Sequence, residues 1–185
     1  MKKSSLLNLG LPIYLALILS FTLTQCEKET PEMINEEELI TTVTLSISAP
    51  SKTTRNVQWK EGAQTPEITL DSNKTYSVEI SFLDESDPSD VENITEEVIE
   101  EAEEHVVFYE TNLNGLSIQS ASNDVTDSDG NPVGIKTNWQ TPAAGEQGTL
   151  RIYLIHEPTS KIGNARASFG GETDVEVDFL VRINE

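Results

Sequence analysis

The two histidines of the chain, His105 and His156, have the surroundings that best suit metal binding. His105 follows Glu104 at the start of a segment that alternates apolar and polar residues, whereas His156 ends a similar segment and precedes Glu157. Imidazole nitrogen and carboxylate oxygen are both ligands of Zn²⁺ in proteins. If the two segments are neighbouring strands, these four side chains could converge on one divalent ion. The alternative is a structural pair, in which each histidine is hydrogen-bonded at the end of a sheet.

A group of oxygen-bearing side chains suits a different ion. The sequence Asp127-Ser-Asp129-Gly-Asn131 has a D-x-D-x-N spacing, with which alternating side chains can wrap Ca²⁺, and Asp124 lies just upstream. No glutamate follows at the position of the bidentate ligand of an EF-hand. Together with Pro132, the same residues are equally typical of a hairpin turn. A calcium site formed by Asp124, Asp127, Asp129 and Asn131 and a plain turn are therefore both open at this point.

Signatures of catalysis are missing from the sequence. It contains no G-x-S-x-G nucleophile turn, no H-E-x-x-H zinc-protease motif and no glycine-rich phosphate loop. The carboxylates are too numerous for any pair of them to be informative. We therefore expect a protein that is not an enzyme and that needs no organic cofactor, with Ca²⁺ or Zn²⁺ as the ions to consider.

Aromatic side chains offer one more kind of binding surface, a platform for sugar rings. The candidates are Trp59, Trp139, Tyr76, Tyr109 and Tyr153. Aromatic residues make up only 6% of the chain, however, and apolar residues share the faces of both tryptophans. Val57 lies on the side of Trp59, and Ile135 lies on the side of Trp139, so we expect both rings in the core.

The elements that position these residues alternate with a period of two. In the last segment Val175, Val177 and Phe179 alternate with Glu176 and Asp178, which is typical of a strand with one buried and one wet face. The other segments with strand character are 41–47, 54–60, 66–70, 76–82, 105–111, 116–122, 133–139 and 150–154. Turn residues separate them. The sequence predicts an all-β, antiparallel β-sandwich of about eight or nine strands, similar to immunoglobulin or jelly-roll architectures.

One acidic segment has a helical period instead. Ser89-Asp-Val-Glu92 has the form of a capping box, and Val91, Ile94 and Val98 recur at helical spacing after it. Most of the remaining residues up to Glu104 are glutamates. We expect a short amphipathic helix here, or a partly ordered acidic crossover between two strands.

The N-terminus has the features of an export signal. Lys2 and Lys3 precede an apolar run, 13–23, which is too short for a comfortable transmembrane helix but suits a signal peptide. Leu23-Thr-Gln-Cys26 follows and resembles the lipobox of bacterial lipoproteins, although Gln25 replaces the usual small residue. Cys26 is the only cysteine, so lipidation gives a reason for a single thiol in an exported protein. We expect a signal peptide at 1–25, a disordered acidic tether at 26–37 and a β-sandwich domain at 38–185.

The charge of the chain restricts its partners. The formal net charge is −20, and loss of Lys2 and Lys3 with the signal peptide makes it −22. A surface so acidic repels nucleic acid and anionic lipid headgroups, and it favours cations or basic surfaces. We therefore expect no nucleic acid partner, contact with the membrane through the lipid anchor, and an unknown protein or small ligand as the binding partner.

Several blocks of sequence together resemble a family of small, uncharacterised lipoproteins of Bacteroidota. The blocks are EEELITTV (36–43), DVENITEE (90–97), EEHVVFY (103–109), DGNPVG (129–134), LRIYLIHEP (150–158) and GGETDVEVDF (170–179). Members of this family often carry the label "type 1 periplasmic binding fold superfamily protein". That label implies a two-lobed α/β fold, whereas the period of two predicts a sandwich. The resemblance implies a location at the outer membrane, on its periplasmic or cell-surface face, and it brings no catalytic residues.

These observations favour one function class and leave two alternatives open. We expect a membrane-anchored, exported lipoprotein that acts as a non-enzymatic interaction or accessory module. The first alternative is a lipoprotein that binds a metal or a small ligand through His105, His156 or the Asp127 turn. The second is an accessory module that binds carbohydrate.

Overall fold

The computed structural model describes residues 38–49, 53–143 and 145–184. The chain divides after Glu36 into two compact units, and the described residues all belong to the second, Glu37–Glu185. The expected signal peptide, Cys26 and the expected tether lie outside the described residues and stay predictions. Within the described part of the chain, no helix has the length and apolar character needed to cross a membrane.

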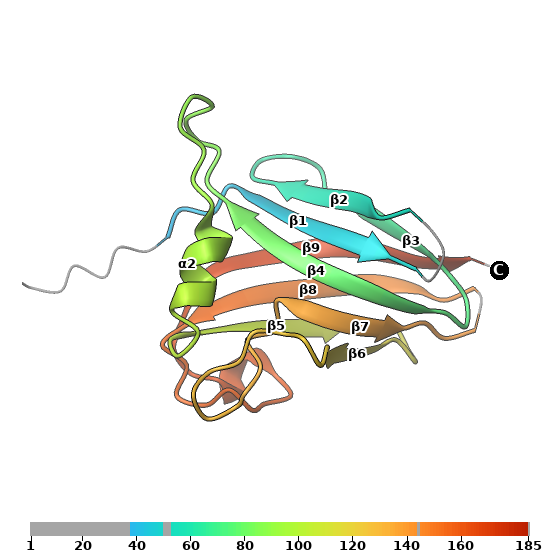
Figure 1. Cartoon of the computed structure of the whole chain (residues 1–185). Helices are drawn as coiled ribbons and strands as arrows, with labels where there is room; N and C mark the ends of the chain where they lie inside the picture. The colour runs from blue at the N-terminus through green and yellow to red at the C-terminus, as the bar shows by residue number, and fades with distance from the viewer. Residues whose placement is uncertain (1–37, 50–52, 144, 185) are drawn as a thin grey trace, which may run out of the picture. The chain divides into compact units, whose positions relative to one another are not determined.

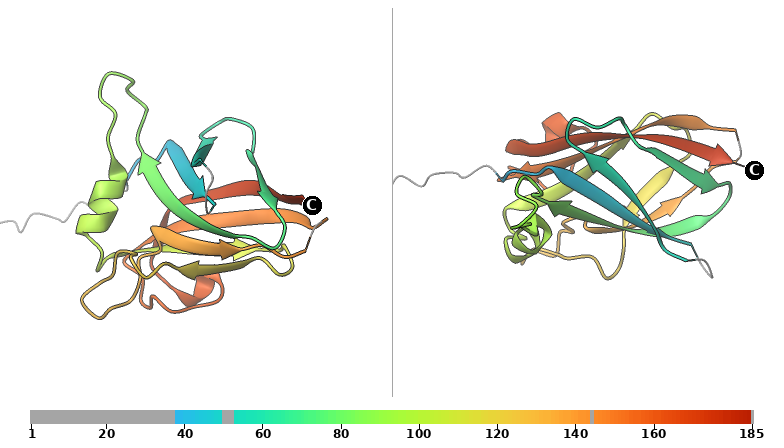
Figure 2. Two further views of the ribbon diagram at one scale, coloured as in Figure 1. Left: turned by 45° about the vertical axis from the view of Figure 1, so that its right-hand side comes forward. Right: turned by 90° about the horizontal axis from the view of Figure 1, so that it is seen from above.

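The described residues form nine strands in two sheets that pack face to face (Figure 1). One sheet has the order β2-β1-β4-β7-β6, and the other has the order β3-β9-β8-β5. The strands are β1 (Thr42–Ser48), β2 (Arg55–Lys60), β3 (Glu67–Asp71), β4 (Thr75–Leu83), β5 (His105–Thr111), β6 (Ser117–Ser120), β7 (Lys136–Gln140), β8 (Gln147–His156) and β9 (Glu172–Asn184). The two further views in Figure 2 show the same pair of layers from the side and from above.

The prediction of an all-β sandwich is confirmed, and the period of two explains why. In β9 the side chains of Val175, Val177 and Phe179 are buried, whereas that of Glu176 is exposed. Each sheet therefore presents one apolar face to the other sheet. The sandwich is not entirely antiparallel. β3 pairs with β9 in parallel, whereas the other strand pairs among the described residues are antiparallel.

The core lies between the sheets and contains the largest aromatic side chains. Phe82, Trp139 and Phe179 are each 0% exposed, and burial of a side chain of this size contributes about 2–3 kcal/mol. Tyr109 packs edge-on against Trp139, with ring centroids 6.3 Å apart. The core placement expected for Trp139 is confirmed. Trp59 is half-buried and packs against the core from its edge, so its expected core placement is met only in part. Binding of carbohydrate stays a prediction.

The predicted helix exists, but it begins later than the capping box placed it. Helix α2 runs Ile94–Glu100 with Asn93 as its N-cap residue, and the hydroxyl of Ser89 donates to Asp87 instead of capping the helix. Val91 is 49% exposed, so it does not belong to the buried face. Ser89 is thus part of a turn that precedes the helix, and this prediction was wrong.

The buried face of α2 covers one end of the sandwich. Ile94 and Val98 of this helix join the core. The hydroxyl of Thr95 accepts a hydrogen bond from the amide of Phe82 at 2.8 Å and donates one to its carbonyl at 3.1 Å. The helix therefore satisfies backbone groups of β4 beyond the end of its pairing with β7.

Several strand ends meet beneath α2. β5 begins at His105, β8 ends at His156 and β9 begins at Glu172, and all three ends lie beside α2 in Figure 1. The segment 157–171 connects β8 with β9 and includes a short 3₁₀ helix, Arg166–Ser168. Gly171 has φ +61°, and a Cβ at this position would lie 2.2 Å from the carbonyl oxygen of His156. Glycine at 171 therefore lets this connection pack against the end of β8.

Candidate histidine–carboxylate metal centre

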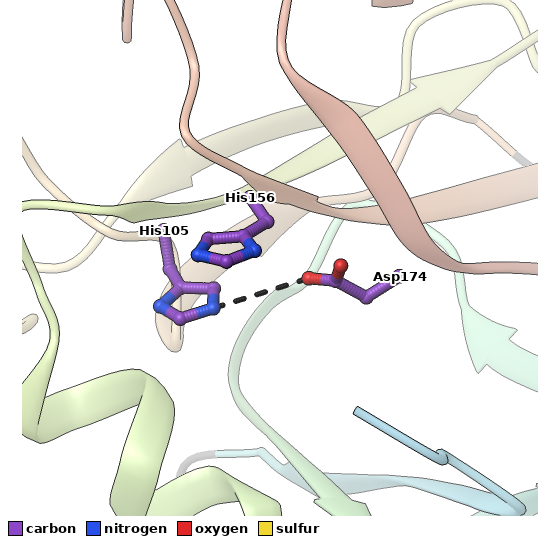
Figure 3. Close-up of side chains that lie close together, drawn as sticks. All are labelled: His105, His156 and Asp174. Atoms are coloured by element: carbon purple, nitrogen blue, oxygen red, sulfur yellow. Dashed lines mark ion pairs between the residues drawn. The ribbon is translucent and has the colours of Figure 1, made fainter. Parts of the chain in front are cut away.

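The two histidines lie side by side at the end of the four-stranded sheet. β5 and β8 are neighbours, and their register pairs His105 directly with His156. The imidazole rings stack with centroids 4.8 Å apart and an angle of 9° between their planes (Figure 3). The condition set by the sequence, that the two histidine-bearing strands be neighbours, is therefore met.

His105 is held with one ring nitrogen directed toward carboxylates. Its side chain is 1% exposed, and its Nδ1 lies 3.2 Å from the carbonyl oxygen of Glu101. A carbonyl oxygen can only accept a hydrogen bond, so Nδ1 must carry the hydrogen and Nε2 keeps its lone pair. Burial lowers the pKa of His105, which keeps the ring neutral. Nε2 has no hydrogen-bond partner among the described residues.

Two buried carboxylates face this nitrogen. Glu38 Oε1 lies 3.6 Å from His105 Nε2, and Asp174 Oδ2 lies 3.9 Å from it. The side chains of Glu38 and Asp174 are 11% and 3% exposed. We call Glu38, His105 and Asp174 the buried trio. It brings two acids and one imidazole nitrogen together in a place that water hardly reaches.

Asp174 reaches the buried trio because of a β-bulge. In the pairing of β8 with β9, Leu154 faces Val175 and Ile155 faces Thr173, so Asp174 is the extra residue. A bulge lets two successive residues point to the same side of a strand. Strict alternation would place Asp174 on the wet face with Glu176, whereas the bulge turns it inward with Val175.

The electrostatics of the buried trio favour a bound positive charge. The pKa of Glu38 is raised to about 8, chiefly by burial and then by nearby acids, of which Glu97 contributes most and Asp174 next. Without a cation, Glu38 therefore keeps its proton at neutral pH. A divalent ion would replace that proton and balance the charges of two carboxylates.

The two distances from His105 Nε2 are close to those of a tetrahedral zinc site. With bonds of about 2.0–2.1 Å, neighbouring ligand atoms of such a site lie about 3.3–3.4 Å apart. The separations of 3.6 and 3.9 Å within the buried trio exceed this by a few tenths of an ångström. Glu101 and His156 are further candidate ligands, since ligand atoms of Glu38, Glu101 and His105 lie within 4.8 Å of one another, and so do those of His105, His156 and Asp174.

His156 has its own carboxylates. Its Nε2 lies 3.6 Å from Glu104 Oε2, and ligand atoms of Glu104, His156 and Glu157 lie within 4.8 Å of one another. We call these residues the surface trio, because the side chain of Glu104 is 56% exposed. The four residues named from sequence, His105, His156, Glu104 and Glu157, thus meet at one end of the sheet but divide between two groups.

The sequence reasoning missed Glu38 and Asp174. Glu38 is the last of three successive glutamates and directly follows the expected tether, and only its position next to Leu39 and Ile40 hints at burial. For Asp174 the only signal is an acidic residue next to the first apolar residue of the last strand. Neither signal distinguishes these acids from the many exposed ones.

The residues considered for calcium form a turn that uses its own oxygens. Asp127 Oδ1 accepts hydrogen bonds from the amides of Asp129 and Asn131 at 3.0 and 2.7 Å. Asp127 Oδ2 accepts from Asn131 Nδ2 at 3.0 Å and lies 3.3 Å from Lys161 Nζ. The carboxylate of Asp124 accepts from the amides of Gly134 and Lys136, both at 2.7 Å. These bonds support the plain turn, and calcium binding here stays a prediction.

Comparisons with known proteins find no relative of the chain: no family model, no curated protein and no solved structure matches it. The geometry of the two trios is therefore the basis on which a function is inferred.

Proposed function

We propose that this chain is an exported, lipid-anchored, non-enzymatic protein whose β-sandwich binds a divalent transition-metal ion between Glu38, His105 and Asp174. The observation that carries the proposal is the environment of His105 Nε2. This nitrogen is buried, has no hydrogen-bond partner among the described residues, and faces two carboxylates at 3.6 and 3.9 Å.

The orientation of His105 supports a metal ligand over a purely structural residue. Metal-binding histidines commonly donate their second ring N–H to a backbone carbonyl or a carboxylate, which fixes the tautomer and aims the lone pair. In this protein the carbonyl of Glu101 accepts that hydrogen bond. A histidine that served only the packing would leave the Nε2 lone pair buried with no donor within hydrogen-bond distance, since even the protonated carboxyl group of Glu38 is 3.6 Å away, and this costs about 1–3 kcal/mol.

The ligand types favour Zn²⁺ and similar ions over Ca²⁺ or Mg²⁺. An imidazole nitrogen suits zinc, copper, nickel and iron, whereas calcium and magnesium prefer oxygen ligands alone. Calcium also takes six to eight oxygens at about 2.3–2.6 Å. The buried trio offers one nitrogen and two carboxylates, which equals in number the three protein ligands of an open zinc site.

The anchoring part of the proposal is supported by the sequence. The short apolar run 13–23, the lipobox-like Leu23-Thr-Gln-Cys26 and the acidic residues that follow agree on export and lipidation. Two or more acyl chains on Cys26 would give stable attachment to the membrane. Replacing Cys26 by serine should move the protein from the membrane fraction to the soluble fraction and remove the acyl mass.

Zinc binding by the mature chain, purified in detergent and stripped of metal, tests the proposal. We expect Asp174→Asn, which preserves the shape of the side chain, to weaken the tightest Zn²⁺ site at least 100-fold, and His105→Ala to abolish it. Asp129→Asn, which removes a negative charge from an exposed position elsewhere, is the matched control and should leave the affinity unchanged. Equal zinc affinity in wild type and Asp174→Asn, both folded by circular dichroism, would overturn the proposal.

A further inference from the structure

The surface trio shares its end of the sandwich with the buried trio but is a separate set of ligands. It arises from a small sequence symmetry: Glu104-His105 opens β5, and His156-Glu157 closes β8. Because β5 and β8 are antiparallel and His105 pairs with His156, the two glutamates come together just beyond the histidine pair. The amide of Glu157 donates to the carbonyl of Glu104 at 2.7 Å and holds the two backbones in place.

The stacking of the rings assigns each histidine to its own carboxylates. The lone pair of an imidazole nitrogen lies in the plane of its ring. With planes only 9° from parallel and centroids 4.8 Å apart, an ion in the plane of His105 lies out of the plane of His156. Ligand atoms of His105, His156 and Asp174 also lie within 4.8 Å of one another, but a single ion there could lie in the plane of only one of the two rings. His105 faces Glu38 and Asp174, whereas Nε2 of His156 lies 3.6 Å from Glu104.

The geometry points to a second divalent-cation site, formed by Glu104, His156 and Glu157, so that the chain binds two ions about the stacked histidine pair. The inference rests on the proposed function, because the buried trio supplies the first of the two ions. The second ion takes one nitrogen and two carboxylates, the same ligand types as the first.

The charges around the surface trio leave room for a cation. Within the part of the chain that the structure describes, neither Glu104 nor Glu157 forms an ion pair with a lysine or arginine. The ammonium group of Lys161 is directed elsewhere, toward Asp127 and the carbonyl of Ala102. The glutamates of α2 and of the residues after it add further negative charge nearby.

The two sites differ in access to solvent, and this sets their expected order of affinity. The side chain of His156 is 16% exposed and that of Glu104 is 56% exposed, whereas the buried trio is almost closed to water. Screening by water weakens the attraction between an ion and exposed carboxylates. We expect the surface site to bind more weakly and to exchange its ion faster than the buried site.

Counting the ions bound per chain tests this inference. The mature chain in detergent is titrated with Zn²⁺ alone, and the bound ions are counted by native mass spectrometry and by metal analysis after equilibrium dialysis. Wild type should bind two Zn²⁺. The double variant Glu104→Gln, Glu157→Gln should keep one, the tighter. The matched control, Glu100→Gln with Asp129→Asn, removes two negative charges from exposed positions and should still bind two.

The outcomes separate the second site from the first. One ion in wild type that persists in the Glu104→Gln, Glu157→Gln variant and is lost in Asp174→Asn would overturn the second site and leave the buried site standing. Two ions that persist in the double variant would also overturn the second site. Failure of wild type to bind Zn²⁺ would overturn both proposals. Loss of only the weaker ion in the double variant, with the tighter affinity unchanged, supports two sites.

Discussion

The aspartate turn around Asp124 and Asp127 and the buried trio are two acidic clusters of the protein. They differ in whether the protein supplies hydrogen-bond donors to the carboxylate oxygens. In the aspartate turn, backbone amides, the Asn131 side chain and Lys161 satisfy the carboxylate oxygens. In the buried trio, His105 Nε2 and Glu38 Oε2 have no hydrogen-bond partner among the described residues. The comparison teaches that the number of carboxylates in a cluster says little about metal binding. What matters is whether the protein supplies its own donors.

Of these two clusters, only the buried trio should stabilise the protein by binding a metal ion, and this is the largest effect we expect. Zn²⁺ at about 1,000 times its dissociation constant should raise the free energy of unfolding by about 4 kcal/mol, since it binds only the folded chain. Ca²⁺ at the same concentration should have no effect, because the aspartate turn has used its oxygens. Thermal unfolding of metal-free protein with each ion measures this. If Ca²⁺ raised the unfolding temperature as much as Zn²⁺ does, the distinction between the two clusters would be wrong.

Asp127→Ala should destabilise the protein without changing zinc binding. The substitution removes the acceptor of two backbone amides and leaves Lys161 without its carboxylate partner, so the midpoint of unfolding should shift to a lower denaturant concentration. Denaturant unfolding measures the loss, and a zinc titration of the same variant is its control. The distinction between a structural and a binding cluster fails if this variant also loses zinc affinity.

The two clusters should respond to pH with opposite signs in metal-free protein. The pKa of Glu38 is raised from 4.5 to about 8, so stability should fall as pH rises from 4.5 to 8, where the unfolded chain loses a proton that the folded chain keeps. Because solvent partly screens this group, we expect a loss of about 2 kcal/mol, less than half of the full effect of the shift. The pKa of Asp127 is lowered, chiefly by the Asn131 side chain, so its stabilisation is present above pH 3.8 and is lost as pH falls through the lowered value.

Unfolding curves between pH 3 and 9 test these signs. Glu38→Gln should remove the decline above pH 4.5, and Asp127→Asn should remove part of the decline at acid pH. A Glu38→Gln curve that still falls by the wild-type amount between pH 4.5 and 8 would show that Glu38 is not the titrating group.

The smallest effect should come from Asp129. Its side chain is exposed, so Asp129→Asn should change the free energy of unfolding by less than about 0.5 kcal/mol, with or without Ca²⁺. A calcium-dependent stabilisation of wild type that disappears in this variant would restore the calcium site that the D-x-D-x-N spacing suggested.

The strands were predictable because alternation is a local property. Val175, Val177 and Phe179 show their burial in the sequence itself, and the residues of β4 alternate in the same way. The order of strands was not predictable, because pairs such as β3 with β9 join segments that are far apart in the chain. The helix start was misplaced for a local reason: Asp87 takes the Ser89 hydroxyl before it can cap a helix.

The candidate site was half predictable. The alternation placed His105 and His156 on the faces of Val107 and Leu154, and the fold then made their strands neighbours. Asp174 was hidden because a bulge reverses the side to which it points, and bulges leave no mark in apolar periodicity. Sequence reasoning also could not show that the amides of Gly134 and Lys136 donate hydrogen bonds to Asp124, because that depends on the tertiary fold.

Glu38 has a mechanical consequence if the chain is tethered at Cys26. Tension along such a tether would enter the folded domain at Glu38, next to the point where the amide of Thr41 bonds to Leu83. An ion shared by Glu38, His105 and Asp174 would cross-link the N-terminal segment to β5 and β9. A force on that segment would then be transmitted to both strands. Detachment of the first strand would then require rupture of metal–ligand bonds as well as hydrogen bonds. Zinc would thus set how firmly the domain resists unfolding by a pull on residue Glu38.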